Sequence, residues 1–241
     1  MTSPAPAPSQ SASGVFSACR WPLAAALTLL ASAAVAHPHG RIDCQAQVEA
    51  NPAGLAAIAL RLTLDGASSA SLLPRLQLGE DGQPAVSKEA RQFGELVAGM
   101  FRQSGWMLKL QRLGADGQAA GPALDLADPE PATFGRNPAG QLTVSVRLLP
   151  DTPAASAHGW KLACLDPTWY WATGFATAAE FSASAPCQAT LEAMANMAEQ
   201  AQALQLAAKN AGVLGADQAA PGLLNAAGVR APSGTIRCMT P

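Results

Sequence analysis

Hydrophobic and polar residues alternate along much of the chain after residue 40, with the period of a strand that has one buried face. The clearest runs are 41–49 and 55–64, and the segment Asn51-Pro52-Ala53-Gly54 between them is typical of a turn. The two runs therefore predict a hairpin. Further strands or extended segments are predicted at 106–113, 123–126, 142–148, 160–165 and 235–239.

Other segments show a helical period or no period. Ser87 is typical of an N-cap for a helix that runs to Gln103. We expect one face of this helix to pack on the core, namely Phe93, Leu96, Val97, Met100 and Phe101. Segment 68–78 fits a short helix or an irregular crossing. An apolar stripe predicts a helix at 190–209, and a shorter helix is expected at 216–228.

The segment 128–140 contains three prolines and two glycines and is expected to be an exposed connection. Strands are predicted on both sides of it, so it does not mark a domain boundary. Together the patterns predict a single α+β domain over residues 37–241, mainly antiparallel β-sheet or sandwich with several helices. Its part 185–241 is expected to be helical and closed by a pair of cysteines.

The chain begins with a segment that has the layout of a secretory signal peptide. An apolar stretch, Trp21 to Val35, follows Arg20 and ends in Ala34-Val35-Ala36. A membrane-spanning helix needs about 20 consecutive apolar residues, and this stretch is shorter. We therefore expect residues 1–36 to be cleaved, the mature chain to begin at His37 in the periplasm, and no membrane span to remain.

Four cysteines follow the expected cleavage site: Cys44, Cys164, Cys187 and Cys238. In an oxidising compartment an even number of cysteines favours disulfides, and no Cys-x-x-Cys spacing indicates a zinc cluster. Three pairings are formally open. We favour Cys44–Cys164, because both residues fall in strand-like segments, and Cys187–Cys238, because these two bracket the carboxy-terminal region.

Composition narrows the class of function. The formal net charge is −2 and 13% of residues are charged, so the chain has no basic footprint for nucleic acid. The sequence contains no Gly-x-Ser-x-Gly motif, no His-Glu-x-x-His motif and no phosphate-binding glycine loop. We expect neither a nucleic-acid partner nor an enzymatic activity.

Two of the three histidines, His37 and His39, directly follow the expected cleavage site. A mature amino-terminal histidine offers its α-amine and its imidazole to one metal ion, and these nitrogens suit Zn²⁺, Cu²⁺ and Ni²⁺. Pro38 lacks the amide proton that the square-planar amino-terminal copper and nickel site needs. Further ligands would come from Asp43, Asp65 or His158. The competing interpretation is a solvated chain end without metal.

Three segments of the chain resemble the domain of unknown function 1007 family, exported bacterial proteins often labelled as periplasmic components of ABC-type transport systems. They are His-Pro-His-Gly-Arg-Ile-Asp at 37–43, Leu-Thr-Leu-Asp at 62–65 and Asp-Pro-Thr-Trp-Tyr at 166–170. Cys187 and Cys238 fall where this family is expected to have a cysteine pair. Gly66 and segment 79–84 depart from the family pattern, which has Glu and an acidic, calcium-loop-like stretch there.

The resemblance implies an association with nickel, cobalt or zinc transport. The expected function is thus to bind a transition metal ion, Zn, Ni, Co or Cu, or to hand it to an inner-membrane transporter. One alternative is a structural or interaction protein of the envelope that binds no metal. A less favoured one is a copper oxidase with an amino-terminal histidine brace.

Overall fold

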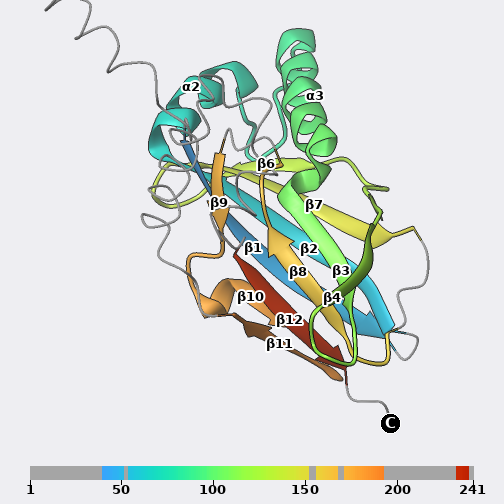
Figure 1. The fold of residues 1–241 in the computed structure, drawn as a ribbon. Coiled ribbons are helices and arrows are strands. Elements are labelled where there is room, and N and C mark those ends of the chain that lie inside the picture. The colour runs from blue at the N-terminus through green and yellow to red at the C-terminus, as the bar shows by residue number, and fades with distance from the viewer. Residues whose placement is uncertain (1–39, 52–53, 152–155, 168–170, 193–231, 239–241) are drawn as a thin grey trace, which may run out of the picture. The chain divides into compact units, whose positions relative to one another are not determined.

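Two β-sheets packed on a shared hydrophobic core form the body of the protein in this computed structural model (Figure 1). The structure describes residues 40–51, 54–151, 156–167, 171–192 and 232–238. These residues lie in one compact unit, 37–241. The expected signal peptide, 1–36, and the predicted helix at 216–228 lie outside the described residues. Of the helix predicted at 190–209, only residues 190–192 are described.

The first sheet has seven strands and is built around the predicted hairpin. Its central strands are antiparallel, whereas β9 and β10 both run parallel to β1. The strand order is β10 (Phe181–Ala183), β1 (Gly40–Asn51), β2 (Gly54–Leu64), β7 (Leu142–Pro150) and β5 (Leu126–Ala127), with β6 (Thr133–Arg136) also paired to β7 and β9 (Trp171–Gly174) to β1.

The second sheet has five strands, and every neighbouring pair in it is antiparallel. Its order is β11 (Cys187–Leu191), β12 (Ser233–Cys238), β8 (Trp160–Cys164), β3 (Leu108–Leu113) and β4 (Ala119–Leu124). The last strand, β12, overlaps the strand predicted at 235–239. It lies next to β8 and so returns the end of the described chain to the body.

The alternating pattern decides which side of each strand faces the core. In β1, Cys44 and Ala46 are fully buried, whereas Gln45 and Gln47, which alternate with them, are exposed. The strands β2 and β7 show the same alternation. One face of the first sheet is therefore apolar and packed, and the opposite face is polar and open to solvent.

Two disulfides hold this arrangement, and both match the pairings that the sequence favoured. Cys44–Cys164 joins β1 of the first sheet to β8 of the second, and both residues are fully buried. Cys187–Cys238 joins residues that are directly paired on the neighbouring strands β11 and β12. The prediction of a mainly antiparallel, disulfide-bonded α+β fold is confirmed.

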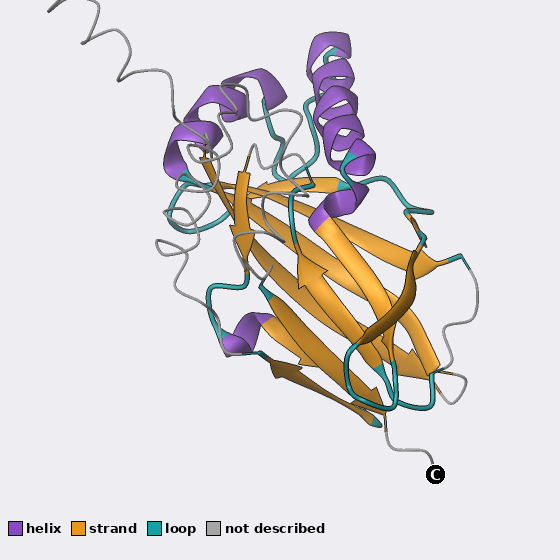
Figure 2. Ribbon diagram, in the orientation of Figure 1, coloured by secondary structure: helices purple, strands orange, loops and turns teal. Residues whose placement is uncertain are grey.

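Two α-helices lie at the same end of the sheets (Figure 2). They are α2 (Gly66–Leu76) and α3 (Lys88–Gln103), and short 3₁₀ turns, η1 (Gly105–Met107) and η2 (Ala178–Glu180), complete the described elements. The Ser87 side chain accepts a hydrogen bond from the Ala90 backbone N–H, which confirms the predicted cap of α3. Within the described ranges no helix is long and apolar enough to cross a membrane.

The predicted buried face of α3 was wrong in part. Phe93, Val97 and Phe101 are buried as expected, but Leu96 and Met100 are 58% and 52% exposed. The buried stripe is completed by small residues, Ala90, Gly94 and Ala98, and not by the two larger ones. These small residues bring the helix close to its neighbours on that side and rotate Leu96 and Met100 toward solvent.

Some predicted boundaries also differ. Segment 128–140 is not wholly an exposed connection, because it contains β6. Phe134 of β6 is buried and pairs with Val144 of β7. Trp106 belongs to a turn with φ of +57° after Gly105, so the strand predicted from 106 begins at Leu108. Thr190 and Leu191, the first residues of the helix predicted at 190–209, lie in β11 instead.

Candidate functional site

The first residue of β1, Gly40, is enclosed by side chains from two other parts of the chain. A Cβ atom at Gly40 would lie 2.6 Å from Asp65 Oδ2, 2.9 Å from Ser68 Oγ and 2.7 Å from Cζ3 of Trp171. No side chain fits there without displacing one of these groups. Two oxygens and an aromatic ring thus surround the point where the chain enters the sheet.

Asp65 is held at this point because it joins a strand to a helix. It follows the last residue of β2 and is the N-cap of α2, where its Oδ1 accepts a hydrogen bond from the Ser68 backbone N–H at 2.8 Å. Its Oδ2 accepts one from the Arg41 backbone N–H at 2.6 Å, and its own N–H donates to the Arg41 carbonyl oxygen at 2.9 Å. Asp65 therefore fixes the start of β1 to the start of α2.

These hydrogen bonds also set the charge of Asp65. Burial on its own would raise the pKa of this carboxyl, but the hydrogen bonds from the Ser68 and Arg41 backbone together outweigh it and lower the pKa below its usual value of 3.8. The carboxylate at the entry of β1 is consequently ionised at neutral pH.

A buried serine fastens the first turn of α2 to the sheet. The Ser69 hydroxyl donates to the Leu64 carbonyl oxygen at 3.1 Å and accepts from the Leu142 backbone N–H at 2.9 Å. Because the side chain is 1% exposed, these bonds are protected from water. The helix start, and Asp65 with it, is therefore rigidly placed against β2 and β7.

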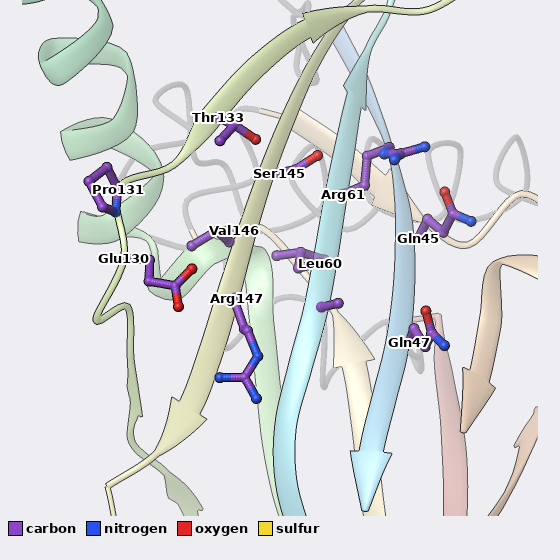
Figure 3. Close-up of a pocket in the computed structure, with 11 residues that line it drawn as sticks. Gln45, Gln47, Leu60, Arg61, Glu130, Pro131, Thr133, Ser145, Val146 and Arg147 are labelled. Atoms are coloured by element: carbon purple, nitrogen blue, oxygen red, sulfur yellow. The ribbon is translucent and has the colours of Figure 1, made fainter. Parts of the chain in front are cut away.

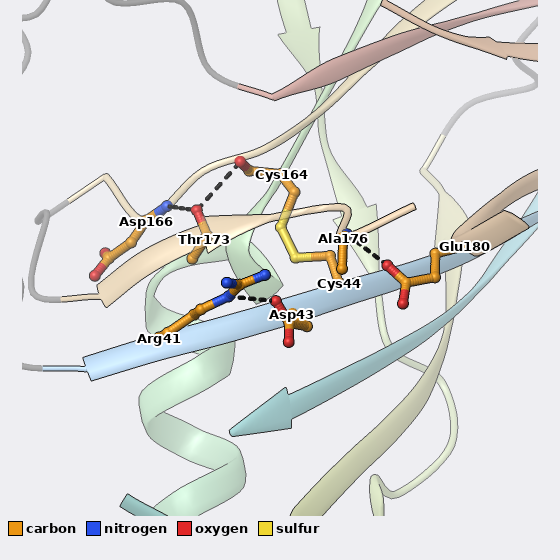
Figure 4. The surroundings of a disulfide bond; sticks show 8 residues. All are labelled: Arg41, Asp43, Cys44, Cys164, Asp166, Thr173, Ala176 and Glu180. Carbon is orange, nitrogen blue, oxygen red and sulfur yellow. Dashed lines mark hydrogen bonds and ion pairs between the residues drawn. A yellow bond between two sulfur atoms is a disulfide. The ribbon is translucent and has the colours of Figure 1, made fainter. Parts of the chain in front are cut away.

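The other wall of the site comes from the connection between β8 and β9. Asp166 is 1% exposed, and its Oδ2 accepts a hydrogen bond from the Trp171 backbone N–H at 2.8 Å. Its own backbone N–H donates to Thr173 Oγ1, which in turn donates to the Cys164 carbonyl oxygen, each at 3.2 Å (Figure 4). The connection is thereby tied to the half-cystine Cys164, and Trp171 is set opposite Gly40 in register.

The candidate ligands named from the sequence do not all meet. Asp43 forms an ion pair with Arg41, with 2.7 Å between Oδ1 and Nε (Figure 4). His158 is exposed and precedes Trp160, the first residue of β8. The last residue of β8, Cys164, is bonded to Cys44 of β1, and the strand is about 13 Å long, so His158 lies at the end of β8 away from this bond. His37 and His39 lie outside the described residues.

Metal ligation by the described residues alone is limited. Across the described ranges, no three or more His, Cys, Asp or Glu side chains form a group that could hold a metal ion. Asp65 is therefore a single carboxylate that would need ligands from residues 37–39 or from another molecule.

Sequence reasoning named Asp65 but missed the residues that enclose Gly40 with it. Ser68, three positions after Asp65, belongs to an N-cap arrangement that was detectable in the sequence. Trp171 was noticed only as part of an aromatic run, since no local pattern shows that β9 pairs with the start of β1.

The segments behind the family resemblance converge at this site. Segment 62–65 reaches the start of β1 through the bond between Asp65 and Arg41, and the connection that begins at Asp166 reaches it through Trp171. The family model described as "Protein of unknown function (DUF1007)" matches residues 23–226. No curated protein and no solved structure gives a significant match. The match covers most of the chain, and this protein belongs to the DUF1007 family.

Proposed function

We propose that this protein binds a divalent transition metal ion, zinc, nickel, cobalt or copper, at the entry of β1. One observation carries the proposal: Asp65 Oδ2 and Ser68 Oγ converge on Gly40, and Gly40 is covalently bonded to His39. A chain spans at most about 3.6 Å per residue, so both histidines are tethered within a short reach of an ionised carboxylate.

The chemistry of these donors supports this assignment. The Asp65 carboxylate accepts hydrogen bonds from the Arg41 N–H at Oδ2 and from the Ser68 N–H at Oδ1, and a carboxylate has about four lone-pair sites for its partners. Imidazole and amine nitrogens with one carboxylate oxygen form a donor set that suits borderline divalent metals. Asp65 is a better third ligand than Asp43, which is paired with Arg41, or His158, which precedes the first residue of β8, at the end of the strand opposite Cys164.

The proposed role is that of a periplasmic accessory protein that binds the ion and hands it to an inner-membrane metal transporter. Closed four-ligand sites are typical of structural metals, whereas a site with few protein ligands keeps a position open to exchange. The proposed site has Asp65 as its one ligand from the body of the domain, so it keeps a position open to exchange. Transfer of the ion to a transporter requires such an open position.

Calorimetric titration with each of the four metals tests the proposal. The protein should be the mature form, with His37 confirmed as its first residue by mass spectrometry. We expect one equivalent of one metal to bind tightly, and the double variant His37→Ala, His39→Ala to lose this binding. His158→Ala is the matched control and should bind like the parent. Equal, weak binding by all three proteins would refute the metal role.

A second function, that of an interaction protein of the envelope without metal, is favoured by one observation. Leu96 and Met100 lie one helical turn apart on α3 and expose more than half of their surface. If crosslinking from these two positions captures a specific partner while every metal titration is blank, this second function replaces the first.

A further inference from the structure

A groove lined by both polar and apolar residues crosses the outer face of the first sheet, on the side away from the core (Figure 3). Its volume is about 320 Å³, at the lower end of the range for small-molecule sites. The strand register arranges its side chains in two rows across the sheet. One row is Thr133, Ser145, Arg61 and Gln45, and the next is Arg147, Ala59 and Gln47.

A small residue makes the floor of the groove. Ala59 lies on β2 directly between Arg147 of β7 and Gln47 of β1. Its methyl group leaves room for the Arg147 side chain to reach Glu49 on β1, with Nη2 to Oε2 at 2.7 Å and Nε to Oε1 at 3.4 Å. Arg147 of this ion pair lines the groove.

Glu49 is paired with Arg147, and a second carboxylate, Glu130, lines the groove. The hydrogen bond and charge of Glu49, assisted by the charge of Glu130, raise the pKa of Arg147 above its ordinary value. The second guanidinium, Arg61, is exposed, and within the described part of the chain it makes no ion pair or side-chain hydrogen bond. Arg61 is thus an exposed cation of the groove that no carboxylate of the described residues pairs.

We propose that this groove binds a small, hydroxyl-rich carboxylate, whose carboxylate group pairs with Arg61. A guanidinium takes a carboxylate through two parallel N–H···O bonds, which fixes orientation as well as charge. The hydroxyls of Ser145 and Thr133 and the amide of Gln45, all in the same row, offer donors and acceptors for hydroxyl groups. None of the 11 lining residues is aromatic, which disfavours a flat aromatic ligand.

This inference stands apart from the metal site. The groove is lined by residues of β1, β2, β6 and β7 and by Glu130 and Pro131, which precede β6. Asp65, Ser68 and Trp171 do not line it. The probe should therefore be tested on protein stripped of metal with a chelating resin, so that binding cannot occur through a bound ion.

Titration with D-gluconate, followed by heteronuclear NMR on assigned resonances, tests the groove. Sorbitol is the matched neutral compound, because it carries a CH₂OH group where gluconate has its carboxylate. We expect gluconate to cause saturable shifts at Arg61, Gln45 and Ser145, and sorbitol to cause none. Equal shifts by the two compounds, or no saturable shift by gluconate, would overturn the proposal.

Two variants separate charge from shape. Arg61→Gln removes the cation and should weaken gluconate binding tenfold or more, roughly the worth of a charge-assisted hydrogen bond. Ala59→Leu fills the floor without changing charge and should also abolish binding. Arg91→Gln is the matched control, because Arg91 is an exposed arginine of α3. If Arg61→Gln and Arg91→Gln bind gluconate equally, Arg61 is not the anchor and the proposal fails.

Discussion

Removal of the disulfide between the sheets is expected to cost more stability than removal of the disulfide within one sheet. Cys44 and Cys164 are 120 residues apart, and the chain-entropy model assigns about 5 kcal/mol to closing such a loop. Cys187 and Cys238 are 51 residues apart, for which the same relation gives about 4 kcal/mol. The structure adds a second difference, because Cys44 and Cys164 are both fully buried whereas Cys238 is partly exposed.

Replacing fully buried sulfur atoms by hydrogen leaves small voids, which adds to the loss for the first pair. The double variant Cys44→Ala, Cys164→Ala should therefore be less stable than Cys187→Ala, Cys238→Ala by about 1–2 kcal/mol. Urea unfolding followed by tryptophan fluorescence measures this, since Trp106 and Trp160 are 2% and 1% exposed and report on the core. The reasoning is refuted if the second variant is the less stable, or if both lose under about 1 kcal/mol.

Three further predictions address the site and the helix. Gly40→Ala forces a methyl group against Asp65 and should cost about 1–3 kcal/mol in urea unfolding; an unchanged midpoint would show that Gly40 is not enclosed. Because the folded pKa of Asp65 is lowered, its ionisation stabilises the fold above pH 3.8, and this contribution disappears as the pH falls through the lower folded value. The parent protein should thus exceed Asp65→Asn in free energy of unfolding by less below about pH 4 than at neutral pH. A difference that grew on acidification would contradict the lowered pKa. On α3, Leu96→Gln should change stability by under about 0.5 kcal/mol whereas Phe93→Ala should cost about 3–5 kcal/mol, and equal losses would place Leu96 in the core.

The parts of the fold that depend on local pattern could be predicted from the sequence. Alternation located β1, β2 and β7, because one face of each strand is buried and the other is solvated. The cap at Ser87 follows from a single side chain that bonds its own helix. Both disulfides could be favoured because their cysteines lie in, or bracket, recognisable segments.

The features that were missed depend on pairing between distant segments. β6 forms because Phe134 is buried beside Val144, and nothing near residue 134 shows that β7 will lie there. Leu96 and Met100 fit the helical period, yet Ala90, Gly94 and Ala98 decide which side packs. The enclosure of Gly40 requires Asp65, Ser68 and Trp171, which come together only through the register of β1 with β2 and β9.

The central claim is that the folded domain contributes Asp65 to a metal site completed by the preceding histidines. The most direct measurement is the affinity of the mature Asp65→Asn variant for the bound metal, by calorimetry. Asparagine caps a helix about as well as aspartate and can keep the bond from the Ser68 N–H, but it loses the bond from the Arg41 N–H together with the charge. Urea unfolding of the variant should therefore accompany the titration and show that it is folded. Asp43→Asn, a change to a nearby carboxylate of β1, is the matched control. We predict that Asp65→Asn weakens metal binding tenfold or more, as loss of a ligand should, while Asp43→Asn binds like the parent. Equal affinity for the parent and Asp65→Asn would contradict the claim.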